Sequence, residues 1–170
     1  MKRCALLALS VLLCSCGTTS SEVIQKVKYD FGVGEKPEGY VSGSDKVEAR
    51  MNDVGKGELK RMNMEGRQGE VAYAEEGPLR GKYYKKVKTY ESYRSLEARP
   101  TSHGVQGEQG YVGLIQYTYR VYEGERKNNR TEAAAAPANL RTDVTGRETY
   151  RYKFNSGGGW DGAHGERTRD

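Results

Sequence analysis

The stretch VGLIQYTYRVY, residues 112–122, has the clearest periodicity in the chain. In an extended conformation, one face carries apolar and aromatic side chains, those of Ile115, Tyr117, Tyr119 and Val121. The opposite face carries polar side chains, those of Gln116, Thr118 and Arg120. A period of two is typical of a β-strand with one face buried and the other in water. The stretch is therefore predicted to be a strand of an antiparallel sheet.

Three other segments are predicted to be strands. Residues 149–155 repeat the alternation, with the aromatic residues Tyr150, Tyr152 and Phe154 on one face and the basic residues Arg151 and Lys153 on the other. A shorter strand is predicted to begin at Val71 and Tyr73. The segment YYKKVKTYESYR, residues 83–94, is rich in residues that favour strands.

Helices are expected nearer the N-terminus. Asp45 and Glu48 have the spacing of a capping box, and apolar residues follow at helical spacing, at Val47, Met51 and Val54. Glycine destabilises a helix interior, so this helix is expected to break or kink at Gly55 and Gly57. Apolar residues beyond them predict a further turn or two, at Leu59 and Met62.

The first segment after the polar residues at 18–21 is open to two interpretations. Residues 22–31 fit a strand by alternation and also fit one face of a helix, and the helix is favoured. Glycine, proline and serine predict a loop over residues 32–44.

Together these segments predict an α+β fold, a small antiparallel sheet of three to five strands with short N-terminal helices packed on one face. One domain is predicted over residues 22–155. Residues 131–136 fit a strand or a loop edge, and residues 138–146 are predicted to be a loop. Residues 156–170 are predicted to be a Gly-rich flexible tail, from which Trp160 can fold back onto the sheet.

The core is expected to be thin and rich in tyrosine. Leu, Ile, Val and Phe together make up 21 of the 155 residues from Cys16 onward, whereas all 13 tyrosines lie in this part. Such a low aliphatic content indicates disorder only where the net charge is high. Here 26 basic groups face 23 acidic ones, so a folded domain is predicted.

The composition also excludes several classes of function. The near balance of charge gives no support to nucleic-acid binding. All three cysteines lie within the first 16 residues, so the body has no disulfide, cysteine-ligated metal centre or cysteine nucleophile. His103 and His164 lack the spacing of a metal site and are interpreted as surface residues. No cofactor, metal or catalytic residue is predicted, and the chain is not expected to be an enzyme.

The N-terminus carries the most specific motif. Lys2 and Arg3 precede an uncharged apolar stretch, ALLALSVLL at residues 5–13, which has the length of a signal-peptide core and is too short to span a membrane. The sequence Leu-Cys-Ser-Cys at residues 13–16 resembles the lipobox of bacterial lipoprotein precursors. The resemblance covers the first 16 to 18 residues and leaves the body of the chain unassigned.

The resemblance implies a lipid anchor. In this family a signal peptide, here residues 1–15, is removed, and the sulfur of the following cysteine, Cys16, accepts the lipid. Residues 16–21 would then form the lipidated cysteine and a short tether. Gly17 stands where an aspartate would indicate retention in the inner membrane, so the outer membrane is favoured over the inner membrane. An ordinary secretory signal peptide is the alternative.

Basic and aromatic residues are interleaved in the predicted strands. A sheet face made of them could hold anionic glycan or lipid headgroups, and the candidate ligand-binding residues are Tyr84, Lys86, Lys88, Arg120, Arg151 and Lys153. The simpler interpretation is a core face of tyrosine and an outer face of solvated cations.

The sequence predicts a lipid-anchored protein of the bacterial envelope with a non-catalytic structural or protein-interaction role. Its expected partners are the membrane, through the lipid, and an envelope protein or cell-wall glycan. The alternative is the binding module for anionic ligands.

Overall fold

The computed structural model describes residues 20–30, 33–35, 37–75, 81–101 and 110–169. The predicted signal peptide, the lipid acceptor Cys16 and His103 lie outside these described residues. The chain divides into two compact units, one up to Tyr40 and one from Val41 onward, a boundary within the segment predicted as one domain. None of the described helices is both long enough and apolar enough to cross a membrane.

The first unit contains helix α1 (Ser20–Asp30). The helix is the favoured of the two interpretations of this segment, and it begins inside the predicted tether. Beyond it, the Val33 N–H donates to the Lys28 carbonyl at 2.8 Å. The ring of Tyr29 meets that of Tyr40 edge-on, with centroids 6.4 Å apart.

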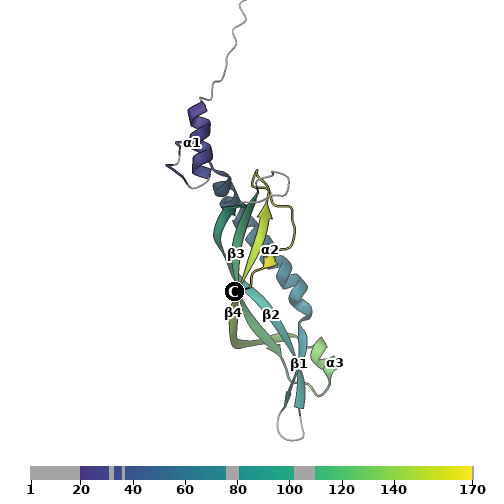
Figure 1. Ribbon diagram of the computed structural model, residues 1–170. Helices are drawn as coiled ribbons and strands as arrows, with labels where there is room; N and C mark the ends of the chain where they lie inside the picture. The colour runs from purple at the N-terminus through teal and green to yellow at the C-terminus, as the bar shows by residue number, and fades with distance from the viewer. Residues whose placement is uncertain (1–19, 31–32, 36, 76–80, 102–109, 170) are drawn as a thin grey trace, which may run out of the picture. The chain divides into compact units, whose positions relative to one another are not determined.

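The second unit is built on a five-stranded antiparallel sheet, which confirms the predicted α+β fold (Figure 1). Its strands follow the chain order across the sheet: β1 (Glu70–Glu75), β2 (Gly81–Pro100), β3 (Tyr111–Gly124), β4 (Ala138–Phe154) and β5 (Glu166–Arg167). Neighbouring strands follow one another in sequence, so each connection joins adjacent strands.

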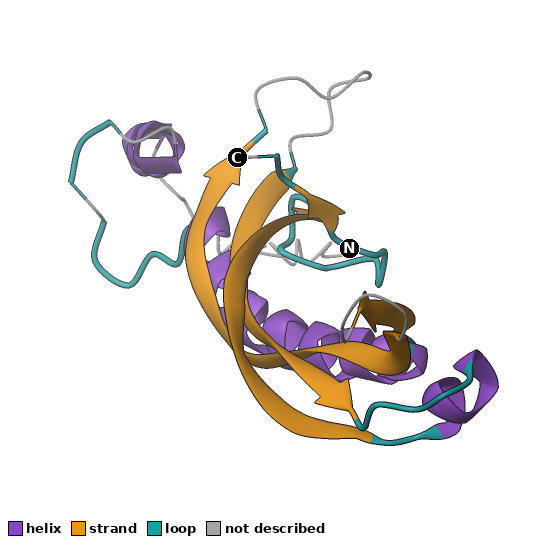
Figure 2. Cartoon of the chain, turned by 90° about the horizontal axis from the view of Figure 1, so that it is seen from below, coloured by secondary structure: helices purple, strands orange, loops and turns teal. Residues whose placement is uncertain are grey.

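One long helix, α2 (Gly43–Glu65), packs against this sheet, whose strands curl round it (Figure 2). The capping box at its start uses Ser42 and Asp45, three residues earlier than the predicted pair. The expected break at Gly55 and Gly57 is wrong, because α2 is continuous through both glycines. The ring of Tyr93 lies where a Cβ of Gly55 would be, so this glycine allows helix and sheet to approach closely.

The core lies between α2 and the inner face of the sheet. The predicted helix residues Val47, Met51 and Val54 are buried there, and the sheet contributes Tyr90, Ile115, Tyr117, Tyr152 and Phe154. The alternation predicted for β3 and β4 is confirmed, since their apolar or aromatic positions face the helix. Tyrosine provides most of the aromatic surface, as the composition predicts.

Two predictions for residues 131–146 are wrong. Residues 131–136 were expected as strand or loop edge, but helix α3 (Arg130–Ala135) forms there, with the Asn129 side chain accepting from the Glu132 N–H at 2.8 Å. The predicted loop at residues 138–146 is the first half of β4. Most side chains in that half are exposed on both faces, so no apolar alternation marks it as a strand.

The segment predicted as a flexible tail pairs with the sheet. Trp160 forms a β-bridge with Phe154 and packs against the core, which confirms that it folds back. A tight turn with Gly158 at φ +79° precedes it, closed by the Asn155 side chain. Further on, β5 pairs with β4 at Tyr150 and Arg151.

Glycine and tyrosine meet repeatedly in this unit. At five of the glycines that the structure describes, a Cβ would come within 2.5 Å of a tyrosine side chain, in the pairs Gly43–Tyr111, Gly55–Tyr93, Gly81–Tyr73, Gly146–Tyr119 and Gly165–Tyr152. Each ring therefore occupies the place of a missing side chain, which lets backbone segments pack closely around large aromatic groups.

Candidate functional site

A cavity of about 850 Å³ lies between the C-terminal half of α2 and the inner face of the sheet. The helix lines it with four side chains at helical spacing, those of Glu58, Arg61, Met62 and Glu65. The sheet lines it with Lys86, Lys88, Tyr90, Val121, Val144 and Tyr150. The C-terminal segment adds His164 and Gly165, so residues far apart in sequence form one site.

Among the residues that the structure describes, two carboxylates beside this cavity are buried, and Glu58 is one of them. Its side chain is held by an ion pair with the Arg61 guanidinium and accepts from the Tyr152 hydroxyl at 3.3 Å. The hydroxyls of Tyr152 and Tyr117 are 2.9 Å apart, which extends the network into the core. Burial raises the pKa of Glu58, and the charge of Arg61 offsets only part of that effect.

Glu148 on β4 is the other buried carboxylate. It accepts from Lys88 Nζ at 2.8 Å, from the Tyr90 hydroxyl at 2.5 Å and from the Tyr150 hydroxyl at 3.1 Å, and Arg167 Nη1 lies 3.2 Å away. Burial by itself would raise the pKa of Glu148, but the hydrogen bonds from Lys88 and Tyr90 outweigh it and the pKa is lowered. These contacts fix the orientation of the polar groups on the sheet side of the cavity.

One donor at the cavity lacks an acceptor. Arg61 Nε is buried and makes no hydrogen bond within the part of the chain that the structure describes. The carboxylate of Glu65, one helical turn further on, has its Oε1 3.9 Å from Arg61 Nε, which is too long for a hydrogen bond. A buried donor without an acceptor is costly, so this position favours an external acceptor.

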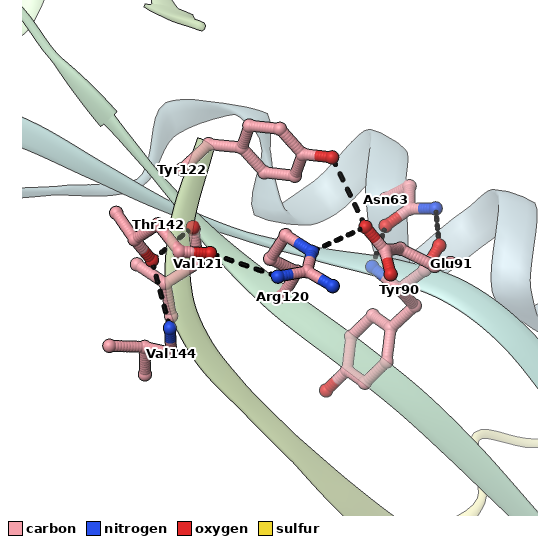
Figure 3. A network of polar contacts seen from close by, with 8 residues as sticks. All are labelled: Asn63, Tyr90, Glu91, Arg120, Val121, Tyr122, Thr142 and Val144. Atoms are coloured by element: carbon pink, nitrogen blue, oxygen red, sulfur yellow. Dashed lines mark hydrogen bonds and ion pairs between the residues drawn. The ribbon is translucent and has the colours of Figure 1, made fainter. Parts of the chain in front are cut away.

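A bulge in β4 places Val144 in the lining of the cavity. Figure 3 shows the polar contacts around this bulge. The β3–β4 register shifts between Arg120 and Tyr122. At this point the Thr142 hydroxyl donates to the Val121 carbonyl at 2.7 Å and accepts from the Val144 N–H at 3.2 Å. The Thr142 carbonyl accepts from Arg120 Nη1 at 2.9 Å. The bulge thus leaves Val144 lining the cavity with 57% of its surface exposed.

Asn63 joins α2 to β2 next to the cavity. Its side chain donates to the Tyr90 carbonyl and accepts from the Tyr90 N–H, both at 2.8 Å (Figure 3). The β2–β3 register shifts between Tyr90 and Ser92, so this amide satisfies backbone groups at an irregular point of the strand. It holds the Tyr90 side chain at the cavity.

The structure brings two of the six candidate binding residues together. Lys86 and Lys88 both line the cavity. Tyr84 is buried beyond it, with the Arg126 guanidinium 3.6 Å from its ring centroid. Lys86 Nζ lies 5.2 Å from the same ring centroid.

The other three candidates lie on the opposite face of the sheet. Arg120 Nε donates to Glu91 at 3.0 Å, and Arg151 and Lys153 both pair with Glu166 of β5. The six residues therefore do not converge in one concavity. Side chains along β3 and β4 alternate between the two faces of the sheet, so the basic residues of these strands lie on the face opposite the aromatic residues and the cavity.

Several residues of the site were not predicted, although the sequence carries signals for three of them. Glu58 and Arg61 share a helix face with Met62 and Glu65, and Glu148 is a charged residue in line with the aromatic face of β4. His164, predicted to be at the surface, is exposed and lies at the cavity. Comparison of the chain with protein-family models, curated proteins and solved structures gave no match.

The two carboxylates predict opposite dependences of stability on pH. Because the pKa of Glu58 is raised, the folded state keeps a proton that the unfolded chain loses above about pH 4.5. The contribution of Glu58 to the free energy of unfolding therefore falls as the pH rises from about 4.5 to the raised pKa. The lowered pKa of Glu148 gives a contribution that is present above about 4.5 and lost as the pH falls through the lowered value.

Urea unfolding at about pH 4 and about pH 7 tests this. Relative to wild type, Glu58→Gln is expected to gain stability on going to the higher pH, and Glu148→Gln to lose it. A change of the same sign in both variants would contradict the assignment.

Proposed function

We propose that this chain is a lipoprotein of the bacterial envelope, anchored through a lipid on Cys16, whose body is a non-catalytic module that binds a small molecule. The lipobox-like sequence supports the anchor. The observation that carries the binding role is the cavity beside α2. Its volume falls in the range of ligand sites, roughly 300–1,000 Å³, and its lining combines apolar surface with a few fixed polar groups.

The state of the two buried carboxylates supports binding over catalysis. A general acid or base must exchange a proton with a substrate, and a nucleophile must be free to attack. Glu148 is held by Lys88, Tyr90 and Tyr150, and Glu58 by Arg61 and Tyr152. Both carboxylates are therefore better suited to hold the lining side chains in place.

A protein-interaction role is the second candidate. The outer edge of β4 meets β5 and Trp160 near its end, and from Ala138 to Glu148 no described segment pairs with it. Leu140 in this stretch is 52% exposed. An open strand edge with apolar side chains can accept a strand from another protein.

Filling the cavity is expected to abolish ligand retention. Val144→Trp adds an indole at an exposed cavity position, so it should occupy the site with little effect on the fold. Leu140→Trp is the matched control, since Leu140 lies on the same strand and outside the cavity lining. Native mass spectrometry of detergent-purified protein, after exposure to the small-molecule fraction of a bacterial envelope, reads out retention.

Wild type and Leu140→Trp are expected to retain the same bound mass and Val144→Trp to lose at least nine-tenths of it. Equal retention in all three proteins, or no retention by wild type, would contradict the binding role. Crosslinks to an envelope protein that disappear only in Leu140→Trp would favour the second candidate.

A further inference from the structure

We propose that the cavity takes an uncharged saccharide, an inference that rests on the proposed binding role of this site. It differs from the alternative that the sequence suggests, an anionic ligand held by the interleaved basic and aromatic residues. Three features of the lining carry it: the pairing of its cations, the mixture of donors and acceptors, and the apolar strip.

The cations of the cavity already have anionic partners. Lys88 pairs with Glu148 at 2.8 Å, and Arg61 pairs with Glu58. Lys86 lies directly opposite Glu70 on β1 and Glu123 on β3, both of which line the same cavity. An anionic ligand would compete with these carboxylates and be repelled by them. Since Glu58 and Glu148 are buried, separating either from its cation would leave a buried charge without its partner.

The polar groups that remain open include both a donor and acceptors. Arg61 Nε is buried and lacks an acceptor among the described residues, and the Arg61 side chain is 26% exposed, so a ligand that draws the guanidinium outward can supply one. On the same side of the cavity, Glu65 and Glu70 are exposed carboxylates that accept hydrogen bonds. A phosphate or carboxylate ligand accepts only, and an ammonium group donates only, whereas a sugar hydroxyl does both. Hydroxyl groups on one ligand can therefore satisfy both kinds of group.

The lining also offers an apolar strip. Met62 from α2, Val121 from β3 and Val144 from β4 line the cavity together with the two paired tyrosines, Tyr90 and Tyr150. A pyranose ring has apolar C–H faces and a polar rim of hydroxyls. This division matches a cavity with an apolar strip beside polar groups.

Three trisaccharides of similar size test the charge of the ligand on the full-length lipidated protein in detergent. The probes are neutral N,N′,N″-triacetylchitotriose, cationic chitotriose and anionic trigalacturonate, each titrated by calorimetry. The neutral probe is expected to bind at least tenfold more tightly than either charged one. Arg61→Lys keeps the positive charge beside Glu58 but removes the Nε donor, and it should weaken binding of the neutral probe about tenfold. Arg99→Lys, at an exposed arginine that pairs with Glu97, should leave binding unchanged.

The outcomes separate this inference from the binding role. Tighter binding of a charged probe that Val144→Trp abolishes would overturn the neutral saccharide and keep the binding module. Failure of the neutral probe to bind, while wild type retains an envelope molecule, would overturn the saccharide alone. Unchanged affinity in Arg61→Lys would overturn the role given to its Nε.

Discussion

Glu148→Leu is expected to lower the free energy of unfolding by about 3 kcal/mol. The substitution removes the shared acceptor of Lys88, Tyr90 and Tyr150 and leaves the buried Tyr90 hydroxyl with a weaker set of partners. Loss of a buried hydrogen-bonded carboxylate costs a few kcal/mol, because the groups that it paired with remain desolvated. Urea unfolding followed by circular dichroism at neutral pH measures the change.

Glu166→Leu is the matched control. Glu166 also contacts two cations, Arg151 and Lys153, which lower its pKa to about 2. Its side chain is 50% exposed, however, and water replaces the lost contacts. The unfolding midpoint of this variant is expected to stay close to that of wild type. Equal losses in the two variants would show that burial is not what makes Glu148 important.

Cys16→Ser is expected to move the whole protein from the membrane fraction to the soluble fraction. A serine hydroxyl cannot replace the thiol sulfur as the lipid acceptor in this processing, so the variant should lack the acyl mass. Two or three acyl chains anchor a protein stably, whereas a chain without them has no comparable affinity for a bilayer. Intact mass and detergent-phase partition of protein expressed in a bacterium measure both effects.

Cys14→Ser tests whether the other cysteine of the Leu-Cys-Ser-Cys stretch could accept the lipid in place of Cys16. This variant is expected to keep both the acyl mass and the membrane fraction, since Ser15 is the small residue that precedes the lipidated cysteine. Loss of the lipid from Cys14→Ser but not from Cys16→Ser would move the anchor to Cys14. An unlipidated soluble product from the wild-type gene would refute the anchor itself.

The sheet could be predicted where one face of a strand is buried. Residues 112–122 and 149–155 alternate because one set of side chains packs under α2 and the other meets water. The first half of β4 has no such asymmetry, and its bulge at Thr142 further disrupts the period. Sequence periodicity reports burial, so a strand exposed on both faces leaves no trace in it.

The helix shows a different limit. Gly55 destabilises an isolated helix, but here close packing against Tyr93 outweighs that local preference. The partner ring is 38 positions away in the chain, so local propensity carries no information about it.

The site was predictable only in part, because it depends on strand register. Lys86 and Lys88 were identified from their composition, but their place in a cavity depends on pairing with Glu123 and Val121 across β3. This register is set by bulges that have no regular spacing in the sequence, at Tyr90/Ser92, Ser95/Glu97 and Arg120/Tyr122. Alternation alone assigns Arg120 to the far face, but the residues that oppose it on β2 and β4 depend on these bulges.

The glycine–tyrosine pairs constrain how this chain can evolve. Gly146 can be replaced by a larger residue only if Tyr119 has first been replaced by a smaller one. Replacement of Tyr119 by a smaller residue in turn leaves a void that a side chain at position 146 could fill. Substitutions at the two members of a pair are therefore epistatic, and their order matters. In related sequences the two positions of each pair are therefore expected to covary, so that glycine and tyrosine are either both retained or both replaced.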